Sequence, residues 1–389
     1  MNTTKRFLLP AVLLSSLALS ACTGSTTAVA PAPSALGEAT YAFYLSAPST
    51  EIDRENRLGS VVLVGPDGQS SSVSTWGMDY GSLAWTDKGL HFSDMKNDYR
   101  LDETGLASIE SEKTDSQYTM LATDADTVVG LYNLGFTEQG YASQLVTTTA
   151  DRSTLTEIEG GYYVTANCDG TIYGAGIATG EYSRTNDPDT EPMMLNQLTN
   201  TKDGKEKHLG LSADARDSAT AGNAPCIDGK IYYISDARKG GLEDAVKPVL
   251  SSWDVTTGEY SQVPIRAESN DEPLLRPDGT GYPQVTPGSV KDGKIEWFGA
   301  GNSVMSTDIK TGQTTRKFMV EGRTDDAASS QAVFTAEEVV VLVDNGDGTD
   351  FRFVHYDRST GEELMRRTLE EAPDGLNNGM ILRGMAIKP

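Results

Sequence analysis

Basic residues are scarce in this sequence. Its 389 residues include 32 Lys and Arg against 56 Asp and Glu, which gives a net charge of −24. Nucleic-acid-binding proteins carry a basic patch or stripe, so the composition argues against a nucleic-acid partner. The same acidity argues against electrostatic binding to anionic lipid headgroups and favours cationic partners or divalent ions.

Motifs for several common chemistries are also missing. The sequence contains no G-x-S-x-G elbow, no Walker loop and no dinucleotide-binding fingerprint opening a helix. Long apolar stretches with a period of 3.6 residues are absent, so we expect no substantial helices. The three histidines, His91, His208 and His355, are predicted to lie in separate repeats and to form no shared site.

One apolar run stands out, at the N-terminus. Lys5 and Arg6 precede an apolar stretch over 7–19, and Leu19-Ser20-Ala21-Cys22 follows the lipobox pattern of bacterial lipoproteins. The run is shorter than the roughly 20 residues that span a bilayer, which disfavours a transmembrane anchor. We predict a signal peptide over 1–21, a lipid on Cys22, and hence an extracytoplasmic protein held at the membrane by that lipid.

Residues 22–39 are small, polar and proline-containing. Such a segment cannot bury enough apolar surface to fold, so we expect a flexible tether. From residue 40 to 389 the sequence consists of short β-branched and aromatic runs separated by Gly, Asp and Asn turns, a pattern typical of an all-β domain.

A tight turn recurs about every 50 residues in this domain. The turns end at Gly68, Gly105, Arg152, Gly204, Gly258, Gly312 and Gly361. Four short strands per repeat predict a seven-bladed β-propeller of four-stranded blades. Residues 39–45 resemble a second strand, and 380–387 form a strand with no partner of its own. We therefore expect the C-terminal strand to complete the first blade. A pair of β-sandwiches is the weaker alternative.

Three of these turns resemble a known family. Asp254–Glu259, Asp308–Gln313 and Asp357–Glu362 are similar to the D-x-x-T-G-E/Q core of pyrroloquinoline-quinone-like propeller repeats. That superfamily includes quinoprotein dehydrogenases and non-catalytic lipoproteins that act as assembly scaffolds. Because the tryptophans that follow the turn in the dehydrogenases are missing from this sequence, the resemblance favours the scaffold type and implies no quinone cofactor.

The remaining cysteines, Cys168 and Cys226, fall near the ends of the first strands of blades four and five. A disulfide between them would join neighbouring blades, and two buried reduced cysteines are the alternative. A further candidate is the segment 344–350, where Asp344, Asp347 and Asp350 could bind Ca²⁺; the same residues also suit an ordinary hairpin loop.

Long charged connections are expected to gather on one face of the propeller, where they would build a binding surface. The candidate residues on it are Arg184, Asp187, Asp189, Glu191, Asp214, Asp217, Arg238, Asp271 and Glu272. We therefore predict a monomeric, lipid-anchored scaffold or recognition module for a protein or cell-envelope polymer. The alternative is a hydrolase or lyase acting on carbohydrate or peptidoglycan through carboxylates at the channel mouth.

Overall fold

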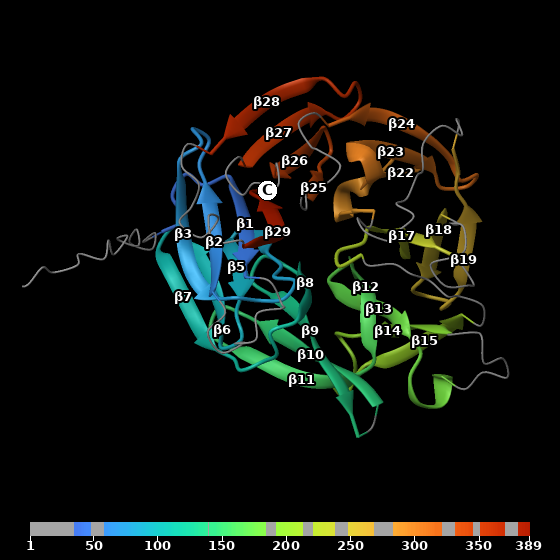
Figure 1. Cartoon of the computed structure of the whole chain (residues 1–389). Coiled ribbons are helices and arrows are strands. Elements are labelled where there is room, and N and C mark those ends of the chain that lie inside the picture. The colour runs from blue at the N-terminus through green and yellow to red at the C-terminus, as the bar shows by residue number, and fades with distance from the viewer. Residues whose placement is uncertain are drawn as a thin grey trace, which may run out of the picture. The chain divides into compact units, whose positions relative to one another are not determined.

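The computed structural model describes residues 35–47, 58–138, 140–183, 192–212, 221–237, 248–267, 283–320, 331–344, 351–369 and 380–389. The chain divides into two units, Met1–Pro31 and Ala32–Pro389, and every described residue belongs to the second. In that unit seven sheets form the blades of a propeller (Figure 1). The predicted all-β, seven-bladed fold is confirmed.

Four strands lie side by side in each blade, in order from the innermost strand outward. Blade one consists of β29 (Ile381–Ile387), β1 (Tyr41–Ser46), β2 (Leu58–Val64) and β3 (Ser70–Trp76). Blade two consists of β4 (Ala84–Thr86), β5 (Gly89–Ser93), β6 (Asn97–Asp102) and β7 (Gly105–Glu110). Blade three consists of β8 (Gln117–Ala122), β9 (Val128–Thr137), β10 (Gly140–Thr148) and β11 (Ser153–Glu159). Blade four consists of β12 (Gly161–Cys168), β13 (Thr171–Ile177), β14 (Met193–Gln197) and β15 (Lys207–Ser212).

The last three blades follow the same order. Blade five consists of β16 (Cys226–Ile227), β17 (Lys230–Asp236), β18 (Pro248–Asp254) and β19 (Tyr260–Pro264). Blade six consists of β21 (Val290–Lys291), β22 (Lys294–Gly299), β23 (Ser303–Asp308) and β24 (Gln313–Met319), and the two-residue β20 (Arg266–Ala267) pairs with its outer edge. Blade seven consists of β25 (Gln331–Phe334), β26 (Glu338–Asp344), β27 (Phe351–Asp357) and β28 (Glu363–Thr368).

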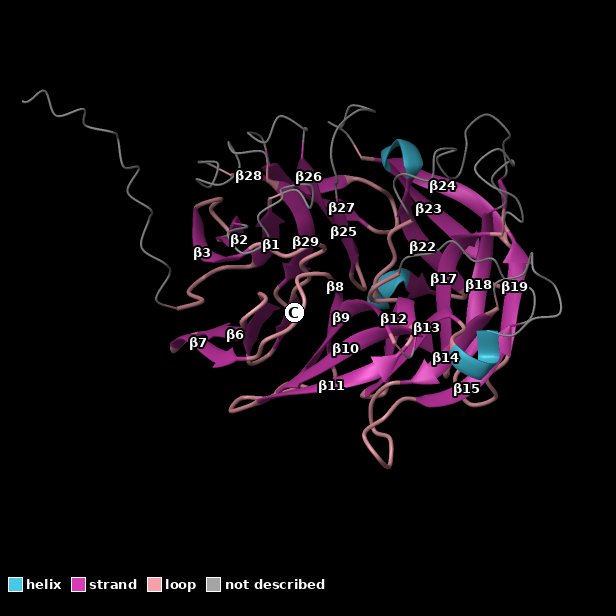
Figure 2. Ribbon diagram, turned by 60° about the horizontal axis from the view of Figure 1, so that its bottom comes forward, coloured by secondary structure: helices cyan, strands magenta, loops and turns pink. Residues whose placement is uncertain are grey.

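Helix is confined, within the described ranges, to three short 3-10 segments (Figure 2). They are η2 (Gly180–Ser183), η3 (Pro287–Ser289) and η4 (Ala300–Asn302). None of the helices in the described part of the chain is long and apolar enough to cross a membrane.

The C-terminal strand closes the ring. β29 pairs antiparallel with β1, with Tyr41 opposite Ile387 and Ser46 opposite Ile381 (Figure 1). At the junction with blade seven, the Tyr41 ring stacks on Phe353 with centroids 4.3 Å apart. The Tyr41 hydroxyl lies 2.8 Å from His355 Nε2, and Glu338 lies 2.5 Å from His355 Nδ1. This Glu–His–Tyr arrangement joins blade seven to blade one.

The packing of each blade between two neighbours explains why the sequences of several strands are unbroken apolar runs. Along β26, Val340 and Leu342 pack in a cluster with blade one, whereas Val339, Val341 and Val343 pack in a cluster with blade six. Both faces of the sheet are therefore buried, and neither set of alternate positions is free to be polar. The outer strands, such as β7 and β28, have mostly exposed or half-exposed side chains.

Two kinds of turn recur in the blades: Asp-Gly turns between first and second strands, and D-x-x-T-G turns between third and fourth strands. Their conformations have different local causes. In the first kind, Asp292 and Gly293 both have positive φ (51° and 73°), as a type I′ hairpin requires. In the second kind, Asp308 Oδ1 accepts hydrogen bonds from the backbone N–H groups of Lys310 (3.1 Å) and Thr311 (2.8 Å) and from the Thr311 hydroxyl. The Thr311 hydroxyl bond and the backbone bonds lower the pKa of Asp308 below its usual value.

The glycine of the D-x-x-T-G turn also packs against the preceding blade. A Cβ added at Gly312 would lie 2.1 Å from the carbonyl oxygen of Pro264 in blade five, and one at Gly258 would lie 2.1 Å from that of Leu209 in blade four. Arg266 N–H donates to the Gly312 carbonyl at 2.9 Å. The turn therefore sets both the hairpin and the distance between blades.

A buried ionic cluster joins blades six and seven. Arg358 Nε donates to Glu296 Oε2 at 2.8 Å, and its Nη2 donates to the Ser289 carbonyl at 3.1 Å. Lys317 Nζ bonds the other Glu296 oxygen at 2.8 Å. Arg358 and Glu296 are both buried, so the Arg358 charge is compensated by Glu296, a carboxylate that Lys317 shares.

Candidate functional site

The order of strands within the blades defines two faces of the propeller. Turns between first and second strands and between third and fourth strands emerge at one end of the sheets, which we call the turn face. Connections between second and third strands, and from one blade to the next, emerge at the opposite end, which we call the connection face. Turn-face connections within the described ranges are short apart from 198–206 between β14 and β15. Every internal gap in those ranges interrupts a connection-face segment.

The candidate residues for a binding surface all belong to connection-face segments, between β13 and β14, β15 and β16, β17 and β18, or β20 and β21. They lie outside the described residues, as do Cys22, Asp347 and Asp350. These candidate residues for the binding surface are Arg184, Asp187, Asp189, Glu191, Asp214, Asp217, Arg238, Asp271 and Glu272. Asp344 is the last residue of β26. No group of three or more His, Cys, Asp or Glu side chains that could hold a metal occurs in the described ranges.

The three histidines lie in different blades. His91 is in β5, His208 is in β15 and His355 is in β27. His91 is buried, and desolvation lowers its pKa to about 4. His208 stacks on Tyr182 with centroids 3.9 Å apart. The structure brings none of them together into a common site.

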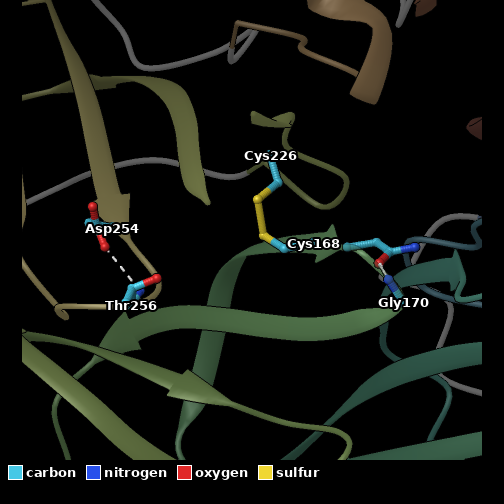
Figure 3. The surroundings of a disulfide bond; sticks show 6 residues. Cys168, Gly170, Cys226, Asp254 and Thr256 are labelled. Atoms are coloured by element: carbon cyan, nitrogen blue, oxygen red, sulfur yellow. Dashed lines mark hydrogen bonds between the residues drawn. A yellow bond between two sulfur atoms is a disulfide. The ribbon is translucent and has the colours of Figure 1, made fainter. Parts of the chain in front are cut away.

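A disulfide joins Cys168 of β12 to Cys226 of β16, the innermost strands of blades four and five (Figure 3). The segment just before Cys226 is held to the same strand. Thr165 N–H donates to the Ala221 carbonyl at 3.0 Å, and Ala224 N–H donates to the Thr165 carbonyl at 2.8 Å. Thr119 and Thr165, from blades three and four, both donate a hydroxyl to the Gly222 carbonyl. The bridge thus fixes the passage between two blades near the centre of the ring.

Aromatic side chains gather on the connection face of blades two to four. Five residues form what we call the aromatic cluster: Tyr80, Tyr118, Phe136, Tyr141 and Tyr163. Tyr80 precedes β4, Tyr118 and Tyr163 lie near the starts of β8 and β12, and Phe136 and Tyr141 flank the β9–β10 turn. Phe136 is 86% exposed and Tyr80 is 59% exposed, while the other three are half-buried.

Contacts join four members of the aromatic cluster: Tyr118, Phe136, Tyr141 and Tyr163. The Tyr118 and Tyr141 hydroxyls are 3.1 Å apart, and the Tyr141 hydroxyl donates to Asn133 Oδ1 at 2.7 Å. Tyr118 meets Tyr163 edge-on, with centroids 6.3 Å apart, and Phe136 meets Tyr141 edge-on at 5.0 Å. Burial raises the pKa of Tyr118 above its ordinary value, as do the bond to Tyr141 and the nearby phenols of Tyr163 and Tyr80. The Tyr118 phenol therefore stays neutral at physiological pH.

Two features of the backbone place these rings. A Cβ at Gly161 would lie 2.7 Å from the Tyr141 ring, so glycine at the start of β12 makes room for that ring against blade four. Tyr80 has a left-handed backbone (φ 61°), which costs a non-glycine residue about 1–2 kcal/mol. It is held there by the neighbouring bonds from Asp79 N–H to the Asp115 carbonyl (2.6 Å) and from Gln117 N–H to the Asp79 carbonyl (2.9 Å).

The aromatic cluster was not predicted from the sequence. The available signal was a tyrosine at the beginning of three successive repeats, at 80, 118 and 163. That the rings meet follows only from the stacking of blades two, three and four around the ring.

Comparisons with known proteins agree with the fold. The model of a family described as "YycP, beta-propeller domain" matches residues 34–382. No curated protein matches the sequence. A hypothetical selenium-binding protein from Sulfolobus tokodaii is similar in structure, with a TM-score of 0.52, 12% identity, and coverage of 92% of this chain and 94% of that chain.

Two further solved structures are similar at the same level. Cobalt-substituted ACO from Synechocystis gives a TM-score of 0.51 at 11% identity, with 91% of this chain and 93% of that chain covered. The β-propeller domain of the trilobed protease from Pyrococcus furiosus gives 0.50 at 11% identity, with coverage of 87% and 96%. That domain is described as having an open velcro topology, whereas in the present chain β29 closes blade one. Identities this low show the fold alone.

Proposed function

The chain belongs to the YycP β-propeller family, and from this premise we propose that it is an extracytoplasmic, lipid-anchored recognition module. It would bind a protein or cell-envelope polymer through the connection face and act as a scaffold. The observation that carries the proposal is the asymmetry of the two faces. The long, mostly acidic connections and a partly exposed aromatic cluster belong to one face, and the other face is built mainly of short structural turns.

The described chain enters the propeller at the turn face. Leu36 N–H donates to the Asp102 carbonyl in a turn of blade two at 2.9 Å, and Thr40 N–H donates to the Val64 carbonyl at 2.9 Å. Both acceptors lie at the turn face.

The proposal requires no cofactor and no catalytic group. The D-x-x-T-G turns that resemble quinone-binding-type repeats have a packing role: Asp254, Asp308 and Asp357 each accept hydrogen bonds from their own turn. We propose that the resemblance reflects the non-catalytic scaffold type. With a net charge of −24, binding of a basic partner would be accelerated by long-range attraction.

In-cell crosslinking of the tagged protein, followed by mass spectrometry, tests the binding role. The variant Asp187→Asn/Asp189→Asn/Glu191→Gln neutralises one connection-face segment. The matched control, Asp67→Asn/Asp151→Asn/Asp203→Asn, removes the same number of charges from exposed turn-face positions. We expect one envelope partner to be captured by the wild type and by the control, and lost or strongly reduced with the connection-face variant. Capture that is equal in all three, or no capture at all, would contradict the proposal.

The anchor is tested separately with Cys22→Ala. We expect the wild type to incorporate labelled fatty acid and to sediment with membranes. The variant should do neither. Membrane retention of Cys22→Ala would refute a lipid on Cys22 as the anchor.

A further inference from the structure

Exposed carboxylates share the connection face with the aromatic cluster. Glu110 and Glu112, at the end of blade two, and Glu138, in the β9–β10 turn, are all exposed on the connection face. The exposed cation in the described part of this region, Lys96, lies over the Trp76 ring with its Nζ 4.2 Å from the centroid. Among these exposed side chains of the connection face, carboxylates therefore outnumber the one cation by three to one.

Rings at this end of blades one to three already accept the chain's own cations. Besides Lys96 over Trp76, the buried Lys113 lies 5.6 Å from the Tyr132 centroid, and Arg383 lies 5.8 Å from the Tyr80 centroid. Arg383 also pairs with Asp79 at 3.5 Å. Within the described ranges, no lysine or arginine lies over Tyr118 or Tyr141, whose rings carry the same negative faces.

Two ring planes at a steep angle can contact one cation from two sides. Tyr118 and Tyr163 have an interplanar angle of 70°, and Phe136 and Tyr141 have one of 85°. Aromatic cages for ammonium groups are built in this way, and they gain most where the cation loses water. Nearby carboxylates would favour the approach of a cation and disfavour that of an anion.

We propose that the aromatic cluster binds a lysine or arginine side chain of a basic segment in the partner protein. This inference rests on the proposed binding role of the connection face and specifies its chemistry. The rings would take the cation by cation–π contact, and Glu112 and Glu138 would attract the flanking positive charges of the segment.

The test uses the full-length protein in detergent micelles at physiological salt and measures binding by titration calorimetry. The probes are an acetylated hexalysine amide, a hexaglutamate and a neutral N-acetylglucosamine hexamer. The informative variants are Tyr118→Leu, which removes the ring, and Tyr118→Phe, which keeps the ring and loses the hydroxyl. Tyr173→Leu is the matched control, because Tyr173 is also half-buried but lies near the turn face in β13.

Hexalysine is expected to bind, and hexaglutamate is not. Tyr118→Leu should weaken hexalysine binding about tenfold, equivalent to about 1.4 kcal/mol, whereas Tyr118→Phe and Tyr173→Leu should stay within about twofold of wild type. Loss of one ring removes a cation–π contact, while a general attraction to an acidic protein would be unchanged by either Tyr118 variant.

Hexalysine binding that is equal for wild type and Tyr118→Leu would overturn the proposal. So would binding of the neutral hexamer that depends on the Tyr118 ring, because the aromatic cluster would then be a glycan site. These results are independent of the lipid and of the cellular partner. If a partner is crosslinked in cells but hexalysine binding does not depend on the Tyr118 ring, the proposed function stands and the aromatic cluster is not the binding site.

Discussion

The contact between blades at Gly312 gives a sharp prediction, because the chain contains a matched glycine. Gly312 and Gly293 have nearly equal positive φ values, 71° and 73°, and both belong to turns of blade six. A Cβ at Gly293 would meet nothing within 4 Å, whereas one at Gly312 would lie 2.1 Å from the Pro264 carbonyl oxygen. Alanine therefore imposes the same backbone strain at both positions, but only Gly312→Ala also creates a clash with the neighbouring blade.

The expected magnitudes follow from these two terms. A left-handed alanine costs about 1–2 kcal/mol, and this should be the whole effect of Gly293→Ala. In Gly312→Ala the blades must also move apart. A forced shift in close-packed structure typically costs a further 1–3 kcal/mol. We expect Gly312→Ala to lower the free energy of unfolding by about 3 kcal/mol, roughly twice the loss in Gly293→Ala or more.

Denaturant unfolding followed by tryptophan fluorescence measures the difference. Trp253 in blade five and Trp297 in blade six are both fully buried, so their emission reports on the two blades that meet at Gly312. Equal destabilisation by Gly293→Ala and Gly312→Ala would refute the reasoning, since it would mean that the blade contact relaxes without cost.

Three further outcomes are expected. Cys168→Ser/Cys226→Ser opens a loop with a sequence separation of 58 residues and should lower unfolding free energy by at most about 4 kcal/mol; an unchanged denaturation midpoint would contradict this. Burial lowers the pKa of His91 to about 4, so as pH falls from about 6.5 the unfolded chain takes up a proton before the folded chain does. The free energy of unfolding should therefore fall by about 3 kcal/mol between pH 6.5 and 4. The variant His91→Gln should lose this part of the acid sensitivity. Arg358→Met leaves Glu296 buried without its guanidinium partner and should cost about 3 kcal/mol or more in thermal or chemical unfolding; a change below about 1 kcal/mol would mean that Lys317 compensates fully.

Local signals account for the parts of the fold that were predictable. Type I′ turns need positive φ, so Asp228-Gly229 and Asp292-Gly293 mark hairpins in the sequence itself. The lone strand at the C-terminus predicted the closure of blade one, because an unpaired edge next to an incomplete blade has one simple solution. The placement of Cys168 and Cys226 on successive innermost strands also followed from counting strands.

The sequence by itself thus determined the repeat, the number of blades, the closure and the face to which the long connections belong, because turns and strand alternation depend on neighbouring residues. Only the tertiary structure decided which side chains from different blades meet. Glu296 and Arg358 pair across 62 positions, and Tyr118 meets Tyr163 across a blade boundary. Those contacts depend on the angle and spacing between packed sheets, and no local pattern encodes these quantities.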